Sequence, residues 1–264
     1  MFPGVEKLLQ EISESGNCWE YSQMEKSAEF FGAGEWILVI TDSMDFAQKL
    51  RDKHICCIGY QDREASEFFP GASAVIFSFE DVDVSYLEMI HHHFYGIPIV
   101  IAETERLVIR ESCIEDFDEL YQISREAGND RYMKNMSADY ELEKEKFQAY
   151  ISTVYDYFGF GLWTVIEKVS ARIIGRCGIS AATDESSPDG SWELGYIIGQ
   201  DYRKKGYGGE ACEAILEYMA KNWDVNSIYA KIHKDNVPSR KLAEKLGFKL
   251  QREAEELLLY YYKK

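Results

Sequence analysis

The stretch Arg203-Lys204-Lys205-Gly206-Tyr207-Gly208-Gly209 lies between two segments of different periodicity, and it decides the fold. Residues 192–198 before it, Trp-Glu-Leu-Gly-Tyr-Ile-Ile, are typical of a strand. After it, apolar residues recur at helical spacing, at Ala211, Ile215 and Met219. The stretch is therefore predicted to be a turn between a strand and the start of a helix.

The composition of this turn predicts a site for a diphosphate. Its three glycines let the backbone approach a ligand closely and direct successive N–H groups toward it. The start of a helix adds a partial positive charge, and Arg203, Lys204 and Lys205 add formal charge. The alternative is a purely structural turn, since a short glycine motif is weak evidence when taken alone.

The chain around this turn favours an α/β domain over residues 104–264. A change of pattern near residues 103–106 marks its start. We expect strands at residues 107–109, 162–166, 173–179, 192–198, 228–232 and 257–262. We expect helices at 115–128 and 140–157, after the glycine turn, and after the strand at 228–232.

Residues 1–103 favour a smaller α/β domain with a parallel sheet of three or four strands. Short apolar runs at 36–40, 55–59, 74–77 and 98–101 alternate with expected helices at 44–53 and 83–94, and a helix is expected at 4–31. Apolar runs separated by helices are typical of parallel strands covered on both faces.

The charge of the chain argues against a nucleic-acid partner. The net charge is −17, and residues 1–103 hold 6 lysines and arginines against 18 acidic residues. Such a surface repels phosphates. No run approaches the ~20 apolar residues of a membrane helix, and no signal peptide precedes the domain, so we expect a cytoplasmic protein without a membrane partner.

No metal site is expected. The six cysteines include no CxxC pair, so neither a zinc site nor a disulfide framework is indicated. His91-His92-His93 would point about 100° apart on a helix and would not converge on one ion.

Three blocks resemble the GNAT N-acetyltransferase superfamily. Arg203-x-x-Gly206-x-Gly208 resembles its acetyl-CoA diphosphate loop, residues 104–110 resemble the opening strand of its RimJ/RimL-type branch, and residues 236–248 resemble its late helix and closing Gly-Phe. The resemblance implies a mixed sheet that splays where acetyl-CoA inserts. It implies transfer of the acetyl group to a primary amine by direct attack in a ternary complex.

Glu193 is the candidate base. An alkyl amine, with a pKa near ~10.4, arrives protonated and must lose a proton before it attacks. Glu193 lies in the strand before the turn, where Trp192 and Leu194 would partly desolvate it. GNAT enzymes often carry a glutamate there. The alternative is a solvated carboxylate or a structural ion pair.

The resemblance implies further roles. The N–H groups of Ile197 and Ile198 would hold the pantetheine arm and polarise the thioester carbonyl, and Asn236 would contact the cofactor as well as cap a helix. The turn residues that would hold the diphosphate are Arg203, Lys204, Lys205, Gly206, Tyr207, Gly208 and Gly209. One departure concerns the general acid, because the usual tyrosine position is Ala243. The alternatives are another tyrosine, such as Tyr196 or a terminal one, water, or a thiolate that leaves unprotonated.

Several questions stay open. The acceptor is a small-molecule or a peptide amine, chosen by loops such as 127–136 and 182–191. The alternative function is a non-catalytic acyl-CoA-binding or interaction module, and whether the chain forms a homodimer is not decided. Residues 41–43 and 81–83 of the first domain weakly resemble a degenerate haloacid-dehalogenase-like unit. No Asp-x-Asp follows a strand there, so we expect that domain to be non-catalytic rather than a phosphoester hydrolase.

Overall fold

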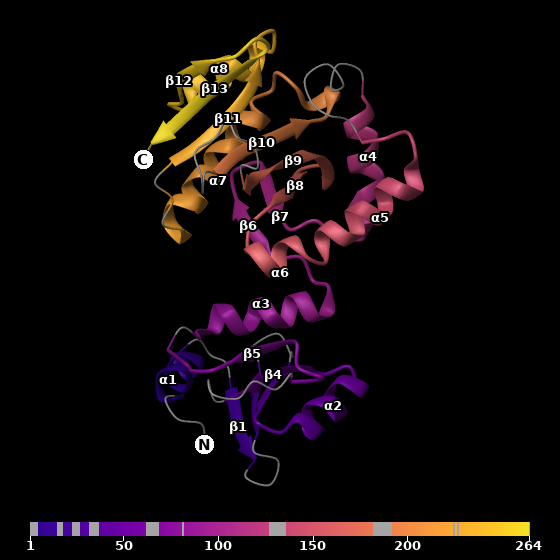
Figure 1. Cartoon of the computed structure of the whole chain (residues 1–264), viewed down its shortest axis with the longest axis vertical. Helices are drawn as coiled ribbons and strands as arrows, with labels where there is room; N and C mark the ends of the chain where they lie inside the picture. Colours follow the sequence, from indigo (N-terminus) through magenta and orange to yellow (C-terminus); the bar gives the residue numbers. More distant parts are fainter. Residues whose placement is uncertain are drawn as a thin grey trace. The chain divides into compact units, whose positions relative to one another are not determined.

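The computed structural model describes residues 5–14, 18–22, 27–31, 37–61, 69–80, 82–126, 136–181, 192–223, 225 and 227–263. The chain forms two compact units, Met1–Ile97 and Pro98–Lys264, each with its own sheet (Figure 1). None of the helices in the described ranges has both the length and the apolar composition of a bilayer-spanning segment.

The first unit is a five-stranded sheet in the order β1-β2-β3-β4-β5. Side chains alternate along a strand, so two neighbouring residues point to opposite faces of the sheet. Leu38 packs with helices α1 and α3, whereas Val39 packs with α2, so helices cover both faces. The three strands β3, β4 and β5 are parallel, as predicted. The bounds are α1 (Glu6–Glu14), β3 (Ile37–Thr41), α2 (Met44–Asp52), β4 (Cys56–Tyr60), β5 (Ala74–Ile76) and α3 (Val84–Tyr95).

The prediction of one helix over residues 4–31 is wrong. Helix α1 ends at Glu14, and two strands follow, β1 (Cys18–Ser22) and β2 (Ser27–Phe31). They form an antiparallel pair, and β2 pairs antiparallel with β3. Their aromatic residues favour extended backbone, and pairing of β2 with both β1 and β3 supplies the hydrogen bonds that a local helix would otherwise make. The parallel strands are therefore part of a larger, mixed sheet.

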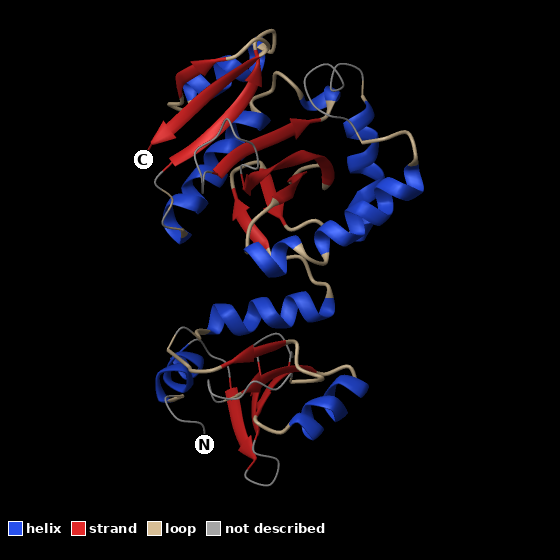
Figure 2. Ribbon diagram, in the orientation of Figure 1, coloured by secondary structure: helices blue, strands red, loops and turns tan. Residues whose placement is uncertain are grey.

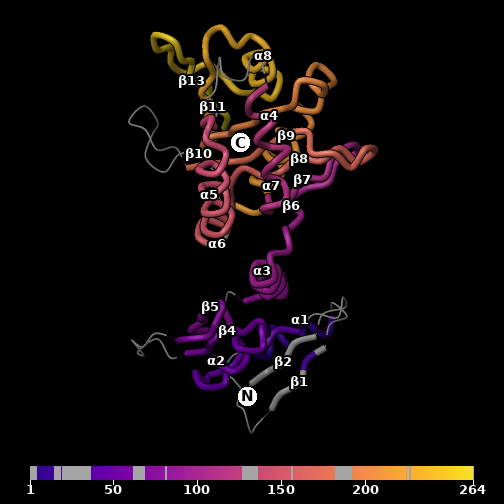
Figure 3. Tube along the Cα trace, turned by 90° about the vertical axis from the view of Figure 1, so that its right-hand side faces the viewer, coloured from indigo at the N-terminus to yellow at the C-terminus, as the bar shows by residue number. Residues whose placement is uncertain are grey.

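The second unit is built on an eight-stranded mixed sheet in the order β12-β13-β11-β10-β9-β8-β7-β6. Every described neighbour pair is antiparallel except β10 with β11. In Figures 1 and 3 the yellow C-terminal segment with α8 and β13 lies at one end of this sheet. The bounds are β6 (Val100–Glu103), β7 (Leu107–Arg110), β8 (Leu162–Glu167), β9 (Arg172–Ala181), β10 (Trp192–Ile198), β11 (Ser227–His233), β12 (Lys249–Glu253) and β13 (Leu257–Lys263).

Helices lie on both faces of this sheet (Figure 2). Cys177 of β9 places its Sγ 3.7 Å from that of Cys212 in α7. Its neighbour Arg176 stacks on Phe147 and Tyr150 of α5, so α7 and α5 cover opposite faces. The helices are α4 (Phe117–Arg125), α5 (Tyr140–Ile151), α6 (Val154–Phe158), α7 (Tyr207–Asn222) and α8 (Val237–Lys245), with short 3₁₀ turns η1 (Ile114–Asp116) and η2 (Gln200–Tyr202).

The two edges of the large sheet differ from the expectations. The strand expected at residues 98–101 as part of the first domain is β6, which pairs with β7 in the second unit. The strand β12 was not foreseen, because all five of its residues are exposed and mostly polar. A strand at the edge of a sheet can pair on one side without burying a side chain, so it leaves no apolar alternation in the sequence.

Candidate active site

Strand β10 is the place where the large sheet opens. On one side it pairs with β9 along its whole length, from Trp192 to Ile198. On the other side its described register with β11 covers two pairs, Trp192 with Ile228 and Glu193 with Tyr229. Beyond Glu193 the two parallel strands part, so that edge of β10 faces something other than β11. This is the splayed, mixed sheet that the family resemblance implied.

A cavity of about 400 Å³ lies where the strands part. Its wall comes from the end of β10, the turn that follows, the first turn of α7, and α8. The lining residues are Tyr196, Ile197, Ile198, Tyr202, Arg203, Lys204, Gly206, Gly208, Gly209, Asn236, Pro238, Ser239, Leu242 and Lys245. Residues up to 49 positions apart in the chain thus meet around one space.

The structure brings together eight of the ten residues that were predicted to bind the cosubstrate. The two that do not line the cavity are Lys205 and Tyr207. Lys205 Nζ lies 5.5 Å from the centroid of the Tyr202 ring. The Tyr207 ring lies against the Arg106 guanidinium, and its hydroxyl donates to Glu167 at 3.3 Å. Successive side chains of a turn point in different directions, and a sequence motif does not tell which of them face the cavity.

The turn brings backbone rather than side chains to the start of α7. Gly206 is the N-cap residue, with a φ of 90°, and makes no side-chain cap bond. The first N–H groups of a helix have no partner inside the helix. A Cβ on Gly208 would lie 3.3 Å from the Tyr196 ring, so this glycine lets α7 begin close to β10. Uncapped N–H groups and the helix dipole together favour an anion here.

Arg203 holds this turn against β10. Its Nε donates to the Ile198 carbonyl at 2.9 Å, and its Nη2 lies 3.4 Å from Glu126 Oε2. Glu126 follows the last residue of α4 and also accepts the N–H of Gln200 at 2.5 Å. These bonds give the Arg203 guanidinium protein partners, which makes it a residue that shapes the turn. Lys204 contributes a cation to the lining beside it.

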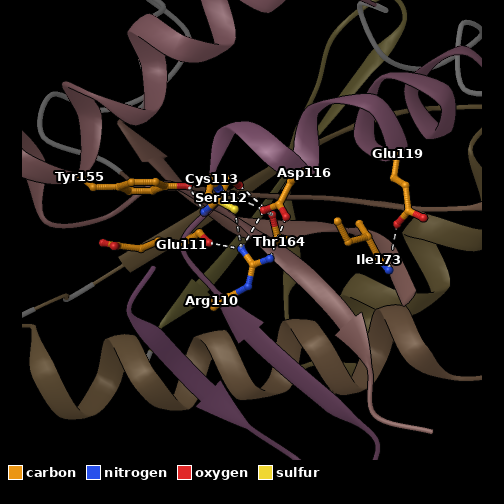
Figure 4. A network of polar contacts seen from close by, with 9 residues as sticks. All are labelled: Arg110, Glu111, Ser112, Cys113, Asp116, Glu119, Tyr155, Thr164 and Ile173. Atoms are coloured by element: carbon orange, nitrogen blue, oxygen red, sulfur yellow. Dashed lines mark hydrogen bonds and ion pairs between the residues drawn. The ribbon is translucent and has the colours of Figure 1, made fainter. Parts of the chain in front are cut away.

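The helix that leads to Glu126 is anchored by a buried polar network (Figure 4). Asp116 accepts two bonds of 2.7 Å from Arg110 and one of 2.8 Å from Thr164. Burial raises the pKa of Asp116, but the bonds from Arg110 and from the Cys113 N–H outweigh it and leave that pKa below its ordinary value. The network fixes the start of α4 against β7 and β8.

Asn236 both caps α8 and lines the cavity. Its side-chain oxygen accepts the Ser239 N–H at 3.3 Å, which is the capping geometry predicted from Asn before Pro-Ser. The same face of α8 supplies Pro238, Leu242 and Lys245 to the lining. Leu242 and Lys245 follow Pro238 at steps of four and three, and such positions share a helix face. Once Pro238 is placed at the site, this spacing could have identified the other two from the sequence.

A pair of hydroxyl groups inside the cavity was not predicted. The Tyr196 and Ser239 hydroxyl oxygens lie 2.9 Å apart, and both residues line the cavity. Burial raises the pKa of Tyr196, more than the bond to Ser239 lowers it, so the phenol keeps its proton at neutral pH. Ala243, at the usual tyrosine position, is buried in the core with Ile215 and Phe248 and does not line the cavity.

Glu193 lies at the point where β10 and β11 part. Its Oε2 is 3.1 Å from Nζ of Lys231 on β11, and both side chains are largely buried, with 28% and 15% of their surface exposed. The structural ion pair that the sequence left as an alternative is therefore present. Glu193 is not among the residues that line the cavity, so a base role needs a substrate that reaches it from the cavity's inner end.

Some of the predicted features lie outside the described residues. The two loops expected to select the acceptor are residues 127–136 and 182–191, of which only Met136 is described. Asp81, part of the haloacid-dehalogenase-like comparison, also lies outside the described residues.

Known proteins resemble the second unit. Residues 106–249 match the family model described as an acetyltransferase (GNAT) domain. The N-acetyltransferase p20 of Bacillus licheniformis is 29% identical over 146 residues, 55% of this chain and 80% of that protein. A ribosomal protein uS5 alanine N-acetyltransferase of Escherichia coli is 28% identical over 173 residues, 62% of this chain and 86% of that protein.

A solved structure shares the fold of this unit. RimL, a ribosomal alpha-N-protein acetyltransferase in complex with coenzyme A, superposes with a TM-score of 0.53 at 15% identity, over 62% of this chain and 98% of that one. The family match begins at residue 106, and the comparisons give no support to a haloacid-dehalogenase-like first domain. The match covers more than half of the chain, which therefore belongs to the GNAT acetyltransferase family.

Proposed function

We propose that this chain transfers the acetyl group of acetyl-CoA to a primary amine by direct attack in a ternary complex. The observation that carries the proposal is the cavity at the parting of β10 and β11, which joins an open strand edge to an uncapped helix start. An extended thioester with a diphosphate at one end matches both parts of such a cavity. Family membership supports the choice of acetyl-CoA.

The chain's own groups have distinct tasks in this proposal. The N–H groups of Gly206 and Gly208, at the start of α7, bind the diphosphate. The Gly209 N–H donates to the Gly206 carbonyl at 3.1 Å, so Gly209 serves the close approach of the ligand instead. Alternate N–H groups of a strand point to opposite edges, and that of Gly199 donates to Ile174 of β9 at 2.8 Å, so between Ile197 and Ile198 it is the Ile198 N–H that faces the open edge. There it binds the pantetheine arm or donates to the thioester oxygen as negative charge develops. Asn236 contacts the arm from the opposite wall.

Glu193 is the proposed base. Its carboxylate, 3.1 Å from Nζ of Lys231, would accept a proton from the ammonium group of the acceptor, directly or through water. Its position on β10 at the last pair with β11 lies beyond the end of the arm, where the acceptor amine must approach. The amine then attacks as a neutral nucleophile.

The hydroxyl pair of Tyr196 and Ser239 is the proposed acid, in place of the tyrosine that is missing at Ala243. Tyr196 keeps its proton at neutral pH and lies in the cavity wall. The departing thiolate of coenzyme A takes a proton from this pair, and Ser239 stabilises the phenolate left behind through the 2.9 Å contact.

The acceptor class is the least constrained part of the proposal. Two acetyltransferases similar to this chain carry ribosomal proteins in their names. A protein N-terminus is therefore the first acceptor to test, followed by small-molecule amines. In this proposal the acidic first unit serves acceptor choice or self-association rather than the chemistry.

Calorimetric titration of acetyl-CoA into the wild type and into Gly206→Glu tests the proposal. The added carboxylate occupies the diphosphate's place, so binding should be lost in the variant. Gly247→Glu is the matched control, because Gly247 has a similar φ of 92° but does not line the cavity. It should keep wild-type affinity. No wild-type binding, or binding that survives in Gly206→Glu, contradicts the proposal. Binding without transfer to any amine favours the non-catalytic alternative.

A further inference from the structure

Arg106, at the start of β7, reaches across to the turn that opens α7. Its Nη1 donates to the Lys205 carbonyl at 3.0 Å, and its Nε donates to Glu210 Oε2 at 2.7 Å. Its guanidinium carbon lies 4.4 Å from the centroid of the Tyr207 ring. Three neighbouring parts of the turn and helix are thus held by one side chain. Arg106 does not line the cavity, so any effect on a ligand passes through the turn.

Glu210 keeps this side chain in place from the first turn of α7. Its Oε2 makes the ion pair with Arg106, while its Oε1 accepts the Arg106 backbone N–H at 3.1 Å and the Thr104 hydroxyl at 2.6 Å. Glu210 is therefore bonded to both the backbone and the side chain of Arg106. Arginine suits this arrangement because its planar fork can donate to two acceptors at once, which the single ammonium of lysine cannot match.

The bond to the Lys205 carbonyl fixes the orientation of one peptide plane. In a trans peptide the C=O and the following N–H point in opposite directions. The Lys205 carbonyl points toward Arg106, so the Gly206 N–H points to the other side of the turn. Gly206 lines the cavity, and a Cβ on it would lie 3.2 Å from Arg106 Nη2. Arg106 thus lies on the side of the turn away from the cavity, and its bond to the Lys205 carbonyl turns the Gly206 N–H away from Arg106.

The charge of Arg106 also matters at this place. Glu210 is an acidic residue in the first turn of the helix whose N-terminus would bind the diphosphate. An unpaired carboxylate there would repel that ligand. Arg106 neutralises it through the ion pair, at a position on the far side of the turn from the cavity.

We propose that Arg106 is a positioning residue for the diphosphate loop: it orients the Lys205–Gly206 peptide so that the Gly206 N–H faces the ligand, and it cancels the charge of Glu210. This inference rests on the proposed function, since it concerns the same cavity. It predicts a specific signature, because only ligands that carry the diphosphate should depend on Arg106.

The experiment compares two ligands on four proteins. Acetyl-CoA and S-acetylpantetheine, which lacks the diphosphate, are titrated into the wild type, Arg106→Met, Arg106→Lys and Lys168→Met. Lys168 is the matched control: its Nζ bonds Glu103 and the Thr104 carbonyl at the same end of β7, without touching the turn. Both methionine variants remove one positive charge. Melting temperatures and circular dichroism are recorded for all four.

We expect Arg106→Met to raise the dissociation constant of acetyl-CoA about tenfold, the size of one lost bond to a charged group. The dissociation constant of S-acetylpantetheine should stay at the wild-type value. Arg106→Lys should fall between, because it keeps the charge but not both bonds, and Lys168→Met should bind as the wild type does.

Each other outcome overturns the inference. Unchanged acetyl-CoA binding in Arg106→Met removes the positioning role. An equal loss for both ligands shows a general disturbance of the cavity instead, and an equal loss in Lys168→Met shows a long-range effect of charge. If Arg106→Met does not fold, the same comparison on Arg106→Lys decides the point. No binding of acetyl-CoA by the wild type is a different result, since it rejects the proposed function itself.

Discussion

At the start of α2, in the first unit, the side chain of Ser43 accepts the N–H of Phe46 at 3.3 Å. At the start of α7, in the second unit, Gly206 occupies the corresponding place and supplies no such bond. Both helices follow a strand of a sheet. In the first unit β3 stays paired with β4 through Thr41, its last residue, whereas in the second unit β10 and β11 part after Glu193.

The difference teaches what turns an ordinary strand–turn–helix into a binding site. A cap satisfies one of the donors at a helix start, and a closed sheet beside it offers a ligand no strand edge. An uncapped helix beside an open strand leaves N–H donors free at two adjoining places, the first turn of the helix and the unpaired edge of the strand. The two turns also differ in length and in glycine content, and the glycines of the second allow the close approach that the open edge requires.

The largest effect is expected from Glu193, at the point where β10 parts from β11. Glu193→Gln keeps the shape of the side chain but cannot accept a proton, so turnover should fall by about 10²–10⁴-fold. Acetyl-CoA affinity should stay unchanged, because Glu193 lies outside the cavity lining. Turnover is measured as coenzyme A release with an identified acceptor, and acetyl-CoA affinity is measured by calorimetry. Glu217→Gln, exposed on α7, is the control, and equal turnover in both variants would remove Glu193 from the role.

The next effect tests the buried polar network of Asp116, which fixes the start of α4. Asp116→Asn leaves the half-buried Arg110 without its charged partner, which should lower the free energy of unfolding of the second unit by about 3 kcal/mol. Urea denaturation measures it, with exposed Glu115→Gln as the control. A loss below about 1 kcal/mol contradicts the importance of this network.

The same residue predicts a pH dependence. Because the pKa of Asp116 lies below its ordinary value in the folded protein, its contribution is complete above the unfolded pKa of ~3.9. It is lost as the pH falls through the lower, folded value. The wild type should therefore lose more stability than Asp116→Asn on going from neutral pH to acid, and parallel curves would speak against a lowered pKa.

A smaller effect is expected from the hydroxyl pair on the wall of the open cavity. Tyr196→Phe removes the proposed proton donor but keeps the ring against Gly208, so turnover should fall by about 10²-fold, the low end for proton transfer, with little change in acetyl-CoA affinity. Tyr218→Phe, on α7 and packed on Trp163, is the control. If Tyr196→Phe turns over at the wild-type rate, the thiolate leaves without help from this phenol.

The smallest effect concerns the closed helix start. Ser43→Ala removes the cap of α2 and should lower the stability of the first unit by about 1 kcal/mol. Ser43→Thr, which can keep the cap, should stay near the wild type. Neither variant should bind acetyl-CoA differently. A new anion site in Ser43→Ala would break the comparison, because it would show that an uncapped helix suffices without the parted strands.

Local patterns predicted most elements of the fold. The strand before the glycine turn, the turn itself and α7 follow from residues that are adjacent in sequence, and the structure confirms them. The misses have another origin. Strand β1 depends on pairing with β2, β2 depends on pairing with β3, and β12 depends on pairing with β13. Pairing between distant segments leaves no fixed period in either segment alone.

The sequence predicted the site only in part, because the site also depends on contacts between segments that are distant in the chain. The motif located the turn, but not which of its side chains face the cavity, since Lys205 and Tyr207 point elsewhere. Tyr196 and Ser239 are 43 positions apart, and only the fold brings their hydroxyls together. The acidic partners of Arg203 and Arg106 lie just after α4 and in α7, and the sequence alone did not identify them.

The parting of β10 from β11 also has a consequence for the protein without its ligand. An open strand edge is a template on which another extended chain can add. A pantetheine arm with its two amides can take that place and act as a short substitute strand, so acetyl-CoA would complete the sheet as well as supply the acetyl group. By linkage, saturating it at 100 times its dissociation constant adds about 2.7 kcal/mol to the stability of the folded chain. Cosubstrate supply would then set how long the protein persists as well as how fast it works.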